Sequence, residues 1–247
     1  MEKKFGLIGK TVGHSFSKNF FDEKFFRDGL RDYHYDLYAL NEIGELKKLL
    51  IDNPELCGLN VTIPFKEQVI KLLNEVDETA KNVGAVNVIK IQNKKLTGFN
   101  TDCVAFLETL QRWLPAEGEY QALILGTGGS SKAVKVALKK LNIPFQTVSR
   151  EQGHADYTYD SLKKDSTAIE NSNLIINTTP LGMTPDTESF PQIPYDKLTP
   201  KHFVYDLIYN PARTVFLQKS EMKGAHVKNG LEMLHEQAEK SWAIWSN

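Results

Sequence analysis

The sequence predicts an α/β protein with two domains. Its 247 residues suit one large or two medium domains and are enough for a substantial core. The N-terminal part alternates strand-like and helix-like segments, which indicates helices packed on a sheet. A second set of strands and helices follows the break "PAEGE" at 115–119, so we expect the domain boundary near the helix that precedes this break.

In the first half, alternation of apolar and polar residues predicts strands, and a 3.6-residue period predicts helices. The strands are expected at 4–9, 33–40, 58–63, 85–92 and 95–99, the last two joined by a turn at Asn93 and Lys94. The helices are expected at 17–30, 42–50 and 66–76. In the first helix, Ser17 is the expected N-cap, Gly29 the expected end, and one face carries Phe20, Phe21, Phe25 and Phe26.

The second half begins with an amphipathic helix at 101–114. Beyond the break, the pattern predicts a helix at 131–141, a polar, proline-rich loop at 185–194, and strands at 120–126, 145–149, 173–179 and 202–208. The last helix, 231–245, is predicted to pack through one apolar stripe, formed by Leu231, Leu234, Ala238, Trp242 and Trp245.

The composition is that of an ordinary globular protein and argues against several function classes. The net charge of -1 provides no overall basic field to recruit nucleic acid or a membrane. Cys57 and Cys103 are too few for a disulfide framework, and no CxxC pair suggests a metal. No stretch has the length of a signal sequence or the roughly 18 apolar residues of a membrane span. We therefore expect a soluble, reduced, cytoplasmic protein.

A glycine-rich stretch, "GTGGSS", follows an apolar strand directly and precedes a helix. Gly126, Gly128 and Gly129 would let a pyrophosphate approach backbone N–H groups at the start of that helix. Ser131 stands where a dinucleotide fingerprint has its third glycine, so an ordinary strand-to-helix turn remains the alternative. The strand–loop–helix context favours a nucleotide.

The residues at the end of the next strand indicate which nucleotide. An NAD-binding domain usually has Asp or Glu there, to bind the ribose hydroxyls. This chain has Ser149 and Arg150, and a hydroxyl with a guanidinium suits a 2′-phosphate. NADP is therefore favoured, although Glu151 alongside weakens this interpretation and a solvated surface arginine is the alternative.

Polar residues of the first domain gather where strands end or helices begin, the edge at which open α/β sheets bind ligands. Each alone could be a helix cap, a turn former or a surface charge, but together they indicate a substrate site. Lys66 and Asp102 can exchange a proton with an alcohol or ketone, and NADP makes hydride transfer the natural reaction. The residues concerned are Ser15, Ser17, Asn60, Thr62, Lys66, Asn87, Asn100, Thr101 and Asp102.

These motifs resemble the shikimate dehydrogenase family over essentially the whole chain. The stretches that carry the resemblance are, in order, "GHSFS", "GLNVTIPFK", "GAVNV", "GFNTD", "GTGGSSKA", "NTTPLGM", "DLIYNPART" and "NGLEMLHEQA". The resemblance implies an N-terminal α/β substrate domain, a Rossmann-like NADP-binding domain and a cleft between them. It assigns residues 1–102 to the first, completed by the C-terminal helix 230–247, and residues 103–229 to the second.

The resemblance also implies an activity and its residues. NADPH would reversibly reduce 3-dehydroshikimate to shikimate, in chorismate and aromatic amino acid biosynthesis. No nucleic acid, membrane or metal is expected as a partner, and the chain is expected to be a monomer or homodimer. Lys66 and Asp102 would be the catalytic pair. Substrate would contact Ser15, Ser17, Thr62, Asn87, Asp102, Tyr209 and Gln237. NADP would contact Gly126, Gly128, Gly129, Ser130, Ser131, Ser149, Arg150, Asn177, Thr178, Leu207, Gly230 and Met233.

The sequence departs from the family pattern in three places. Thr11 replaces a usual proline, and Lys18 stands where a proline commonly follows the second serine, adding a positive charge near the expected carboxylate site. In the adenosine loop, Glu151 and His154 replace a threonine and a second arginine. One cation is lost or becomes pH-dependent and one anion is gained, which bears on the preference for NADP over NAD.

Three alternatives remain open. A quinate/shikimate dehydrogenase that uses both cofactors would differ by small pocket changes near Ser15 and Ser17. A non-catalytic module that senses a metabolite and a nucleotide would be expected to lack Lys66 and Asp102, which this chain has. A methylene-tetrahydrofolate-type dehydrogenase has a similar layout but lacks the paired serines and the "GFNTD" pattern.

Overall fold

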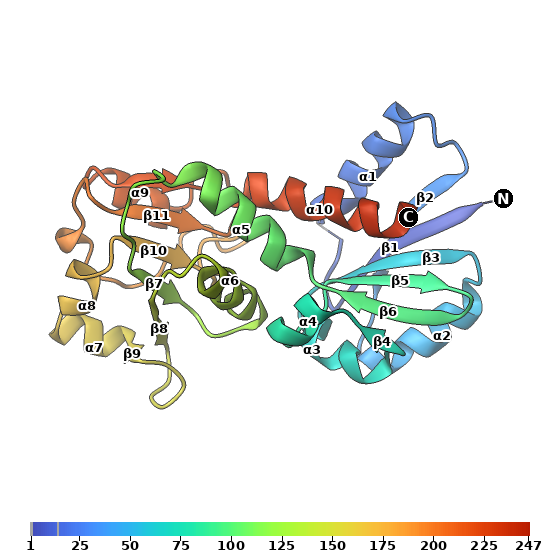
Figure 1. The fold of residues 1–247 in the computed structure, drawn as a ribbon, viewed down its shortest axis with the longest axis horizontal. Helices are drawn as coiled ribbons and strands as arrows, with labels where there is room; N and C mark the ends of the chain where they lie inside the picture. The colour runs from blue at the N-terminus through green and yellow to red at the C-terminus, as the bar shows by residue number, and fades with distance from the viewer. Residues whose placement is uncertain (1, 14) are drawn as a thin grey trace. The chain divides into compact units, whose positions relative to one another are not determined.

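The computed structural model describes residues 2–13 and 15–247 and confirms the α/β class. The chain divides into two compact units, one of residues Met1–Asp102 with Gln237–Asn247 and one of residues Cys103–Glu236. Each unit contains one six-stranded sheet flanked by helices (Figure 1).

The sheet of the first unit is mixed and has the strand order β2-β1-β3-β5-β6-β4. β1 pairs in parallel with β2 and β3, whereas β5 is antiparallel to both β3 and β6. The strands are β1 (Lys3–Gly9), β2 (Tyr33–Ala39), β3 (Leu56–Val61), β4 (Glu75–Val76), β5 (Val88–Gln92) and β6 (Lys95–Phe99). β3 lies inside this sheet, between β1 and β5, and its last four residues are buried.

Helices cover both faces of this sheet, and two apolar clusters form its core. One cluster joins β3 to the helices after β2 and β3, and the other joins β1 and α1 to Trp245 of α10. The helices are α1 (Phe16–Arg27), η1 (Ile43–Glu45), α2 (Leu46–Asp52), α3 (Phe65–Gln68), η2 (Val69–Leu72), α4 (Glu78–Val83), α5 (Thr101–Trp113) and α10 (Leu231–Ser246). Of the last two, the first residues of α5 and the last residues of α10 belong to this unit.

The sheet of the second unit is entirely parallel, with the order β12-β11-β10-β7-β8-β9. From β7 the chain adds β8 and β9 on one side, and then β10, β11 and β12 on the other. The strand order therefore reverses between β7 and β10, which is where doubly wound sheets bind nucleotides. The strands are β7 (Ala122–Leu125), β8 (Phe145–Ser149), β9 (Tyr157–Thr158), β10 (Leu174–Asn177), β11 (Phe203–Asp206) and β12 (His226–Lys228). Its further helices are α6 (Gly129–Lys140), α7 (Tyr159–Lys164), α8 (Thr167–Glu170), η3 (Tyr195–Lys197) and α9 (Val215–Glu221).

The structure corrects several expected elements. Helix α1 is capped by Ser15 rather than Ser17, and Phe26 is 89% exposed instead of sharing the buried face. The helix expected at 66–76 is two short helices followed by the strand β4. Short elements such as α4 and α7 were not expected, because too few residues lie in them for a period to be recognised.

The last helix also buries a different line of residues from the one expected. Leu231 is 39% exposed, whereas Met233 and Ser241 are buried together with Ala238 and Trp245. Ser241 replaces an apolar residue in this line because it has hydrogen-bond partners there.

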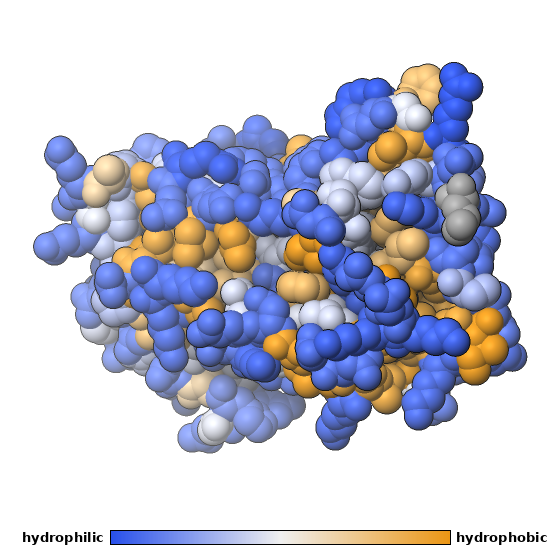
Figure 2. Space-filling model, turned by 45° about the vertical axis from the view of Figure 1, so that its right-hand side comes forward, coloured by the Kyte–Doolittle hydropathy of each residue, from blue (hydrophilic) through white to orange (hydrophobic). Residues whose placement is uncertain are grey.

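The surface is ordinary for a globular protein. On the face drawn in Figure 2, apolar side chains lie in small groups separated by polar and charged ones. Among residues 2–13 and 15–247, no helix is long and apolar enough to cross a membrane.

Candidate active site

Lys66 and Asp102, which the sequence pairs as proton-transfer residues, are in contact. The Lys66 Nζ donates to Asp102 Oδ2 at 2.7 Å, and the two side chains are 17% and 12% exposed. Lys66 lies in α3, the next element after β3, and Asp102 lies in the first turn of α5. An ion pair this close and this shielded from water holds both groups in fixed positions.

Asn87 sets which oxygen of Asp102 faces Lys66. Its Oδ1 accepts from the backbone N–H of Thr101 at 2.7 Å, and that obligate donor fixes the orientation of the amide. Its Nδ2 therefore donates to Thr101 Oγ1 and to Asp102 Oδ1, both at 2.9 Å. Asp102 Oδ1 is occupied by Asn87, and Oδ2 is left for Lys66.

The backbone holds these residues in register. The Val61 N–H donates to the Asn87 carbonyl at 2.9 Å, and the Val86 N–H donates to the Lys66 carbonyl at 2.7 Å. Asn100 donates its amide to the Ala85 carbonyl, so it shapes the turn before α5. The antiparallel pairing of β3 with β5 thus brings the "NVTIPFK" and "GAVNV" stretches together.

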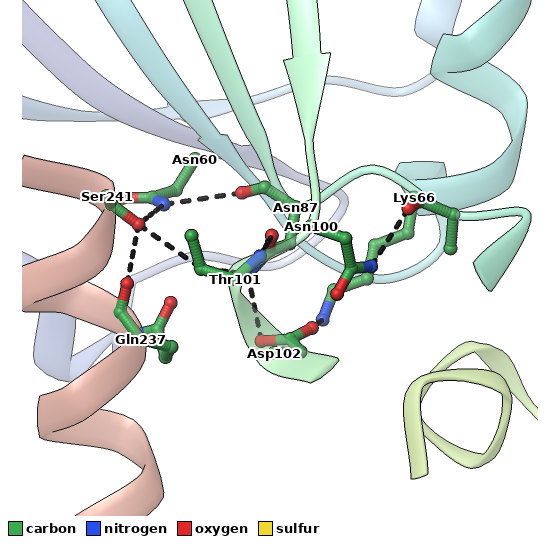
Figure 3. A network of polar contacts seen from close by, with 9 residues as sticks. Asn60, Lys66, Asn87, Asn100, Thr101, Asp102, Gln237 and Ser241 are labelled. Carbon is green, nitrogen blue, oxygen red and sulfur yellow. Dashed lines mark hydrogen bonds and ion pairs between the residues drawn. The ribbon is translucent and has the colours of Figure 1, made fainter. Parts of the chain in front are cut away.

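A second set of buried polar residues adjoins the first (Figure 3). Asn60 Nδ2 donates to the Asn87 carbonyl at 3.3 Å and to Ser241 Oγ at 3.1 Å. Asn60 Oδ1 accepts from the Tyr35 hydroxyl at 2.8 Å, and that hydroxyl also interacts with Ser17. Burial raises the pKa of Tyr35, so it remains a neutral donor. Neither Tyr35 nor Ser241 was selected from the sequence.

The remaining predicted substrate residues of the first unit lie at element ends. Ser15 caps α1 by accepting from the Ser17 N–H at 3.2 Å, and both serines are half-buried. His14 of the same stretch lies outside the described residues. Thr62 follows β3, is half-buried, and donates its N–H to the Ile8 carbonyl. Gln237 is half-buried on α10 one turn before Ser241, to which its carbonyl is bonded.

The unusual Lys18 is already engaged. Its Nζ donates to the Tyr35 carbonyl at 2.7 Å and pairs with Asp22 at 3.1 Å. The positive charge that this residue adds near the two serines is therefore largely neutralised by Asp22.

In the second unit, the glycine loop fits a pyrophosphate. Gly126 has φ +106, and a side chain there would meet Thr178 Oγ1 at 2.7 Å, so only glycine is accommodated. A Cβ at Gly128 or Gly129 would meet no atom within 4 Å, which leaves open space beside the backbone. Gly128 caps α6 without a side-chain bond, so the first N–H groups of this helix remain available to an anion. Ser131 Oγ is buried with no hydrogen-bond partner among the described residues.

The predicted nicotinamide-side residues are adjacent at the carboxyl ends of β10 and β11. The Leu207 N–H donates to the Asn177 carbonyl, and Thr178 donates its hydroxyl to the Leu125 carbonyl. Gly230 lies against the Leu207 carbonyl, where a side chain would clash. Met233 is buried, and Tyr209 is half-buried in the connection after β11.

Asp206 was not selected from the sequence, yet it organises this edge. It accepts from Asn177 Nδ2 at 3.0 Å, the Ile208 N–H at 3.1 Å and the Thr214 hydroxyl at 2.6 Å. Burial raises the pKa of Asp206 to about 6, and these three hydrogen bonds limit the rise. Asn177 donates its amide N–H to Asp206, and its Oδ1 accepts from the Thr179 N–H, so its side chain supports the loop.

The residues expected at the adenosine end lie at the end of β8. Ser149 is buried and its Oγ accepts from the Glu151 N–H at 3.1 Å, while Arg150 is exposed. His154 Nδ1 lies 3.3 Å from Glu151 Oε2, so the two departures from the family pattern face each other. Among the described residues, no group of three or more His, Cys, Asp and Glu side chains could hold a metal ion.

Comparison with known proteins identifies relatives along the whole chain. Residues 7–89 match the family described as "Shikimate dehydrogenase substrate binding domain". A Staphylococcus aureus protein named "Shikimate dehydrogenase (NADP(+))" is 36% identical over 250 residues, covering 99% of this chain and 92% of the relative.

Solved structures agree with the sequence relatives. A chorismate mutase/shikimate 5-dehydrogenase fusion protein from Clostridium acetobutylicum superposes with a TM-score of 0.87 at 33% identity, covering 100% of this chain and 91% of the other. Shikimate 5-dehydrogenase from Thermus thermophilus, in complex with NADP(H) and shikimate, superposes with a TM-score of 0.85 at 28% identity, covering 99% of this chain and 93% of the other.

Proposed function

Because the chain belongs to the shikimate dehydrogenase family, we propose that it is an NADPH-dependent enzyme that reversibly reduces 3-dehydroshikimate to shikimate. The observation that carries this proposal is the shielded Lys66–Asp102 pair, held by Asn87. An acid–base pair and a dinucleotide loop on one chain are what an alcohol–ketone interconversion needs. The reaction belongs to chorismate and aromatic amino acid biosynthesis.

The chemistry divides between cofactor and side chains. When bound, NADPH supplies the hydride that reduces the C3 carbonyl carbon of 3-dehydroshikimate. The C3 oxygen gains electron density as this happens, and the Lys66 ammonium donates a proton to it. The products are shikimate and NADP⁺, and solvent restores the proton to Lys66. In the reverse direction, Lys66 accepts the proton of the C3 hydroxyl.

Asp102 acts on both Lys66 and the substrate. Its Oδ2 holds the ammonium in place, and its Oδ1 is fixed by Asn87. A second lone pair on each oxygen remains available to a substrate hydroxyl. The low exposure of both side chains limits competition from water.

The proposed substrate contacts follow from the available donors and acceptors. Ser15 and Ser17, at the start of α1, would hold the carboxylate of shikimate. Asn87 already uses both of its amide hydrogens, so it would accept from a substrate hydroxyl through Oδ1. Thr62, Tyr209 and Gln237 complete the proposed set.

The proposed domain roles follow the family. Residues 1–102, completed by the C-terminal helix 230–247, would bind the substrate, and residues 103–229 would bind NADP. The grouping of Gln237–Asn247 with Met1–Asp102 in one compact unit supports a substrate domain that the last helix completes.

In the NADP-binding part, the chain's own groups suit the cofactor. The N–H groups at the start of α6 and the Ser131 hydroxyl would bind the pyrophosphate, together with Gly126, Gly128, Gly129 and Ser130. Ser149 and Arg150 would bind the 2′-phosphate. Asn177, Thr178, Leu207, Gly230 and Met233 would lie along the nicotinamide.

The direct test is spectrophotometric. Purified protein should oxidise NADPH when 3-dehydroshikimate is added, and NADH should support a lower kcat/KM. Oxidation of shikimate and of quinate with NADP⁺ and NAD⁺ should be measured alongside. Preference for quinate would replace the proposed substrate, and no turnover of either compound would reject the proposal.

We expect Lys66→Ala to lower kcat by at least about a hundredfold, because the reaction loses its proton donor. The KM for shikimate should change only modestly. Steady-state kinetics of the variant would be compared with those of Lys71→Ala, which removes an exposed lysine from the following helix η2. Near-wild-type turnover of Lys66→Ala would contradict the assignment.

The location and assembly of the protein are also proposals. A cytoplasmic location fits the low cysteine content, with two cysteines in 247 residues. A monomer or homodimer is proposed, and light scattering on a size-exclusion column would measure the mass.

A further inference from the structure

Ser241 is a buried hydroxyl in the middle of the polar network of the first unit. Its side chain is fully buried on α10, where most of the neighbouring buried residues are apolar. Its Oγ donates to the Gln237 carbonyl at 2.7 Å, accepts from Asn60 Nδ2 at 3.1 Å, and lies 3.5 Å from Thr101 Oγ1. It therefore touches residues from β3, α5 and its own helix (Figure 3).

The chemistry of its neighbours fixes the direction of every bond. The Gln237 carbonyl can only accept, so the single hydrogen of Ser241 points there. Ser241 Oγ must then accept from both Asn60 and Thr101. Thr101 donates its only hydroxyl hydrogen to Ser241, and its Oγ1 accepts from Asn87 Nδ2 at 2.9 Å.

The hydrogen bonds continue from Thr101 through Asn87 to the proton-transfer pair. Thr101 Oγ1 receives one amide hydrogen of Asn87, and the other hydrogen of the same amide goes to Asp102 Oδ1. Asn60 supports the same residue from the other side, because it donates to the Asn87 carbonyl. Ser241 is thus two hydrogen-bonded residues away from Asp102, through Thr101 and Asn87.

We propose that Ser241 is a positioning residue for the Lys66–Asp102 pair: it anchors Thr101 and Asn60, which hold the Asn87 amide against Asp102. This proposal rests on the proposed function and deepens it. Ser241 itself does not touch the reacting atoms in this assignment. It acts by keeping the Asp102 carboxylate turned so that Oδ2 faces Lys66.

The same hydroxyl orders Gln237, a proposed substrate residue. The Ser241–Gln237 bond joins a hydroxyl to the carbonyl one turn earlier, which slightly alters a helix where it occurs. The Ser241 side chain therefore connects the backbone of Gln237 to the residues that support the Lys66–Asp102 pair.

The test compares two variants of Ser241 with a matched control. Ser241→Ala removes the hydrogen bonds, and Ser241→Cys keeps the volume while replacing the hydroxyl by a weak hydrogen-bonding thiol. Ser220→Ala is the control, because Ser220 is equally buried and donates to the Phe216 carbonyl at 2.8 Å on α9, apart from the network.

We expect Ser241→Ala and Ser241→Cys to lower kcat by roughly three- to tenfold, the effect of losing one or two ordinary hydrogen bonds. The KM for NADPH should stay within error of the wild type. Ser220→Ala should keep the wild-type kcat, even if its midpoint of thermal unfolding falls as far as that of Ser241→Ala. Wild-type kcat in Ser241→Ala, or full recovery in Ser241→Cys, would overturn the proposal, the second because packing alone would then explain the site.

A wrong positioning role for Ser241 can be distinguished from a wrong proposed function. Wild-type turnover of 3-dehydroshikimate supports the function whatever the Ser241 variants do. A crystal structure of Ser241→Ala tests positioning without any turnover: the Asn87 amide and the Asp102 carboxylate should move from their wild-type places. An unchanged Lys66–Asp102–Asn87 geometry would refute the positioning role.

Discussion

At the scale of single residues, Asn87 does more than its expected part as a hydroxyl-binding residue. Its amide is oriented by the Thr101 N–H, and only this orientation gives Asp102 a donor at Oδ1. An aspartate in its place could not donate to Asp102, and two carboxylates would then lie side by side. The separate occupation of the two Asp102 oxygens therefore depends on the amide of Asn87.

Glu151 is the residue from which we expect a change in cofactor preference. Glu151→Gln should raise the ratio of kcat/KM for NADPH over NADH by about two- to fivefold. The ratio should rise because the variant removes a negative charge near the proposed 2′-phosphate site. The rise should be small because Glu151 is exposed, and charge interactions at exposed positions are weak. Steady-state kinetics with both cofactors would measure the ratio.

The matched control for this prediction is Glu117→Gln, which removes an exposed carboxylate from the segment before β7. It should leave the ratio unchanged. An equal rise in both variants would mean that net charge, rather than the adenosine loop, sets the preference.

At the scale of elements, β3 has some features that the sequence predicts and others that it does not. The alternation of Leu59 and Val61 predicts a buried strand, and both are buried. It does not predict that Asn60 is buried on the other face, because its partners Tyr35 and Ser241 are distant in sequence and belong to other elements. Ile63 continues the apolar alternation but is 66% exposed, since β3 has already ended at Val61.

The other differences between the predicted and the observed elements have similar causes. Ser15 rather than Ser17 caps α1, and sequence alone offers two serines two positions apart with equal capping chemistry. Ser241 sits one turn after Gln237, and the buried stripe of α10 would have revealed it only if its helical face had been known. Polar residues in a buried stripe are the signal to look for.

Two glycines allow stability to be separated from cofactor binding. A Cβ at Gly58 of β3 would overlap the Trp245 indole, so Gly58→Ala should destabilise the protein by about 1–3 kcal/mol. A Cβ at Gly128 would meet no atom within 4 Å, so Gly128→Ala should leave stability nearly unchanged and raise the KM for NADPH several-fold. Urea unfolding and steady-state kinetics would measure the two effects.

Each glycine variant is the control of the other. Loss of stability without a change in the KM for NADPH is expected only for Gly58→Ala. If Gly128→Ala binds NADPH as tightly as the wild type, the loop does not approach the cofactor as proposed.

At the scale of the whole molecule, the sequence predicts the α/β class and the order of most strands and main helices correctly. It does so because long apolar periods and the glycine loop are local signals. The order of the strands in each sheet is not local, and neither is the role of Asp206, whose two side-chain donors, Asn177 and Thr214, come from β10 and the N-cap of α9. Such residues emerge only when separate segments are brought together.

Asp206 should make global stability depend on pH. Its pKa of about 6 in the folded chain lies above the ordinary 3.8, because burial disfavours the charge. Between these values the folded chain holds a proton that the unfolded chain has released, so the free energy of unfolding falls as pH rises. The loss is at most about 3 kcal/mol and is complete above about pH 7.

Urea unfolding at intervals from pH 4 to pH 8 would test this dependence. Asp206→Asn should remove that part of the pH dependence, whatever constant change in stability the lost acceptor brings. Asp160→Asn, at an exposed position of α7, should keep the wild-type slope. The same slope in Asp206→Asn and the wild type would contradict the prediction.

The first unit is built from two distant parts of the chain, and this has a consequence for synthesis. Residues Gln237–Asn247 supply Trp245, which lies over Gly58 and donates to the Ile89 carbonyl at 3.0 Å. The ribosome adds roughly 5–20 residues per second, so the 135 positions from Asp102 to Gln237 take roughly 7 to 27 seconds. During that interval the contiguous residues of the second unit can emerge and fold. The first sheet has already been synthesised by then, but it lacks the Trp245 indole and is accessible to chaperones.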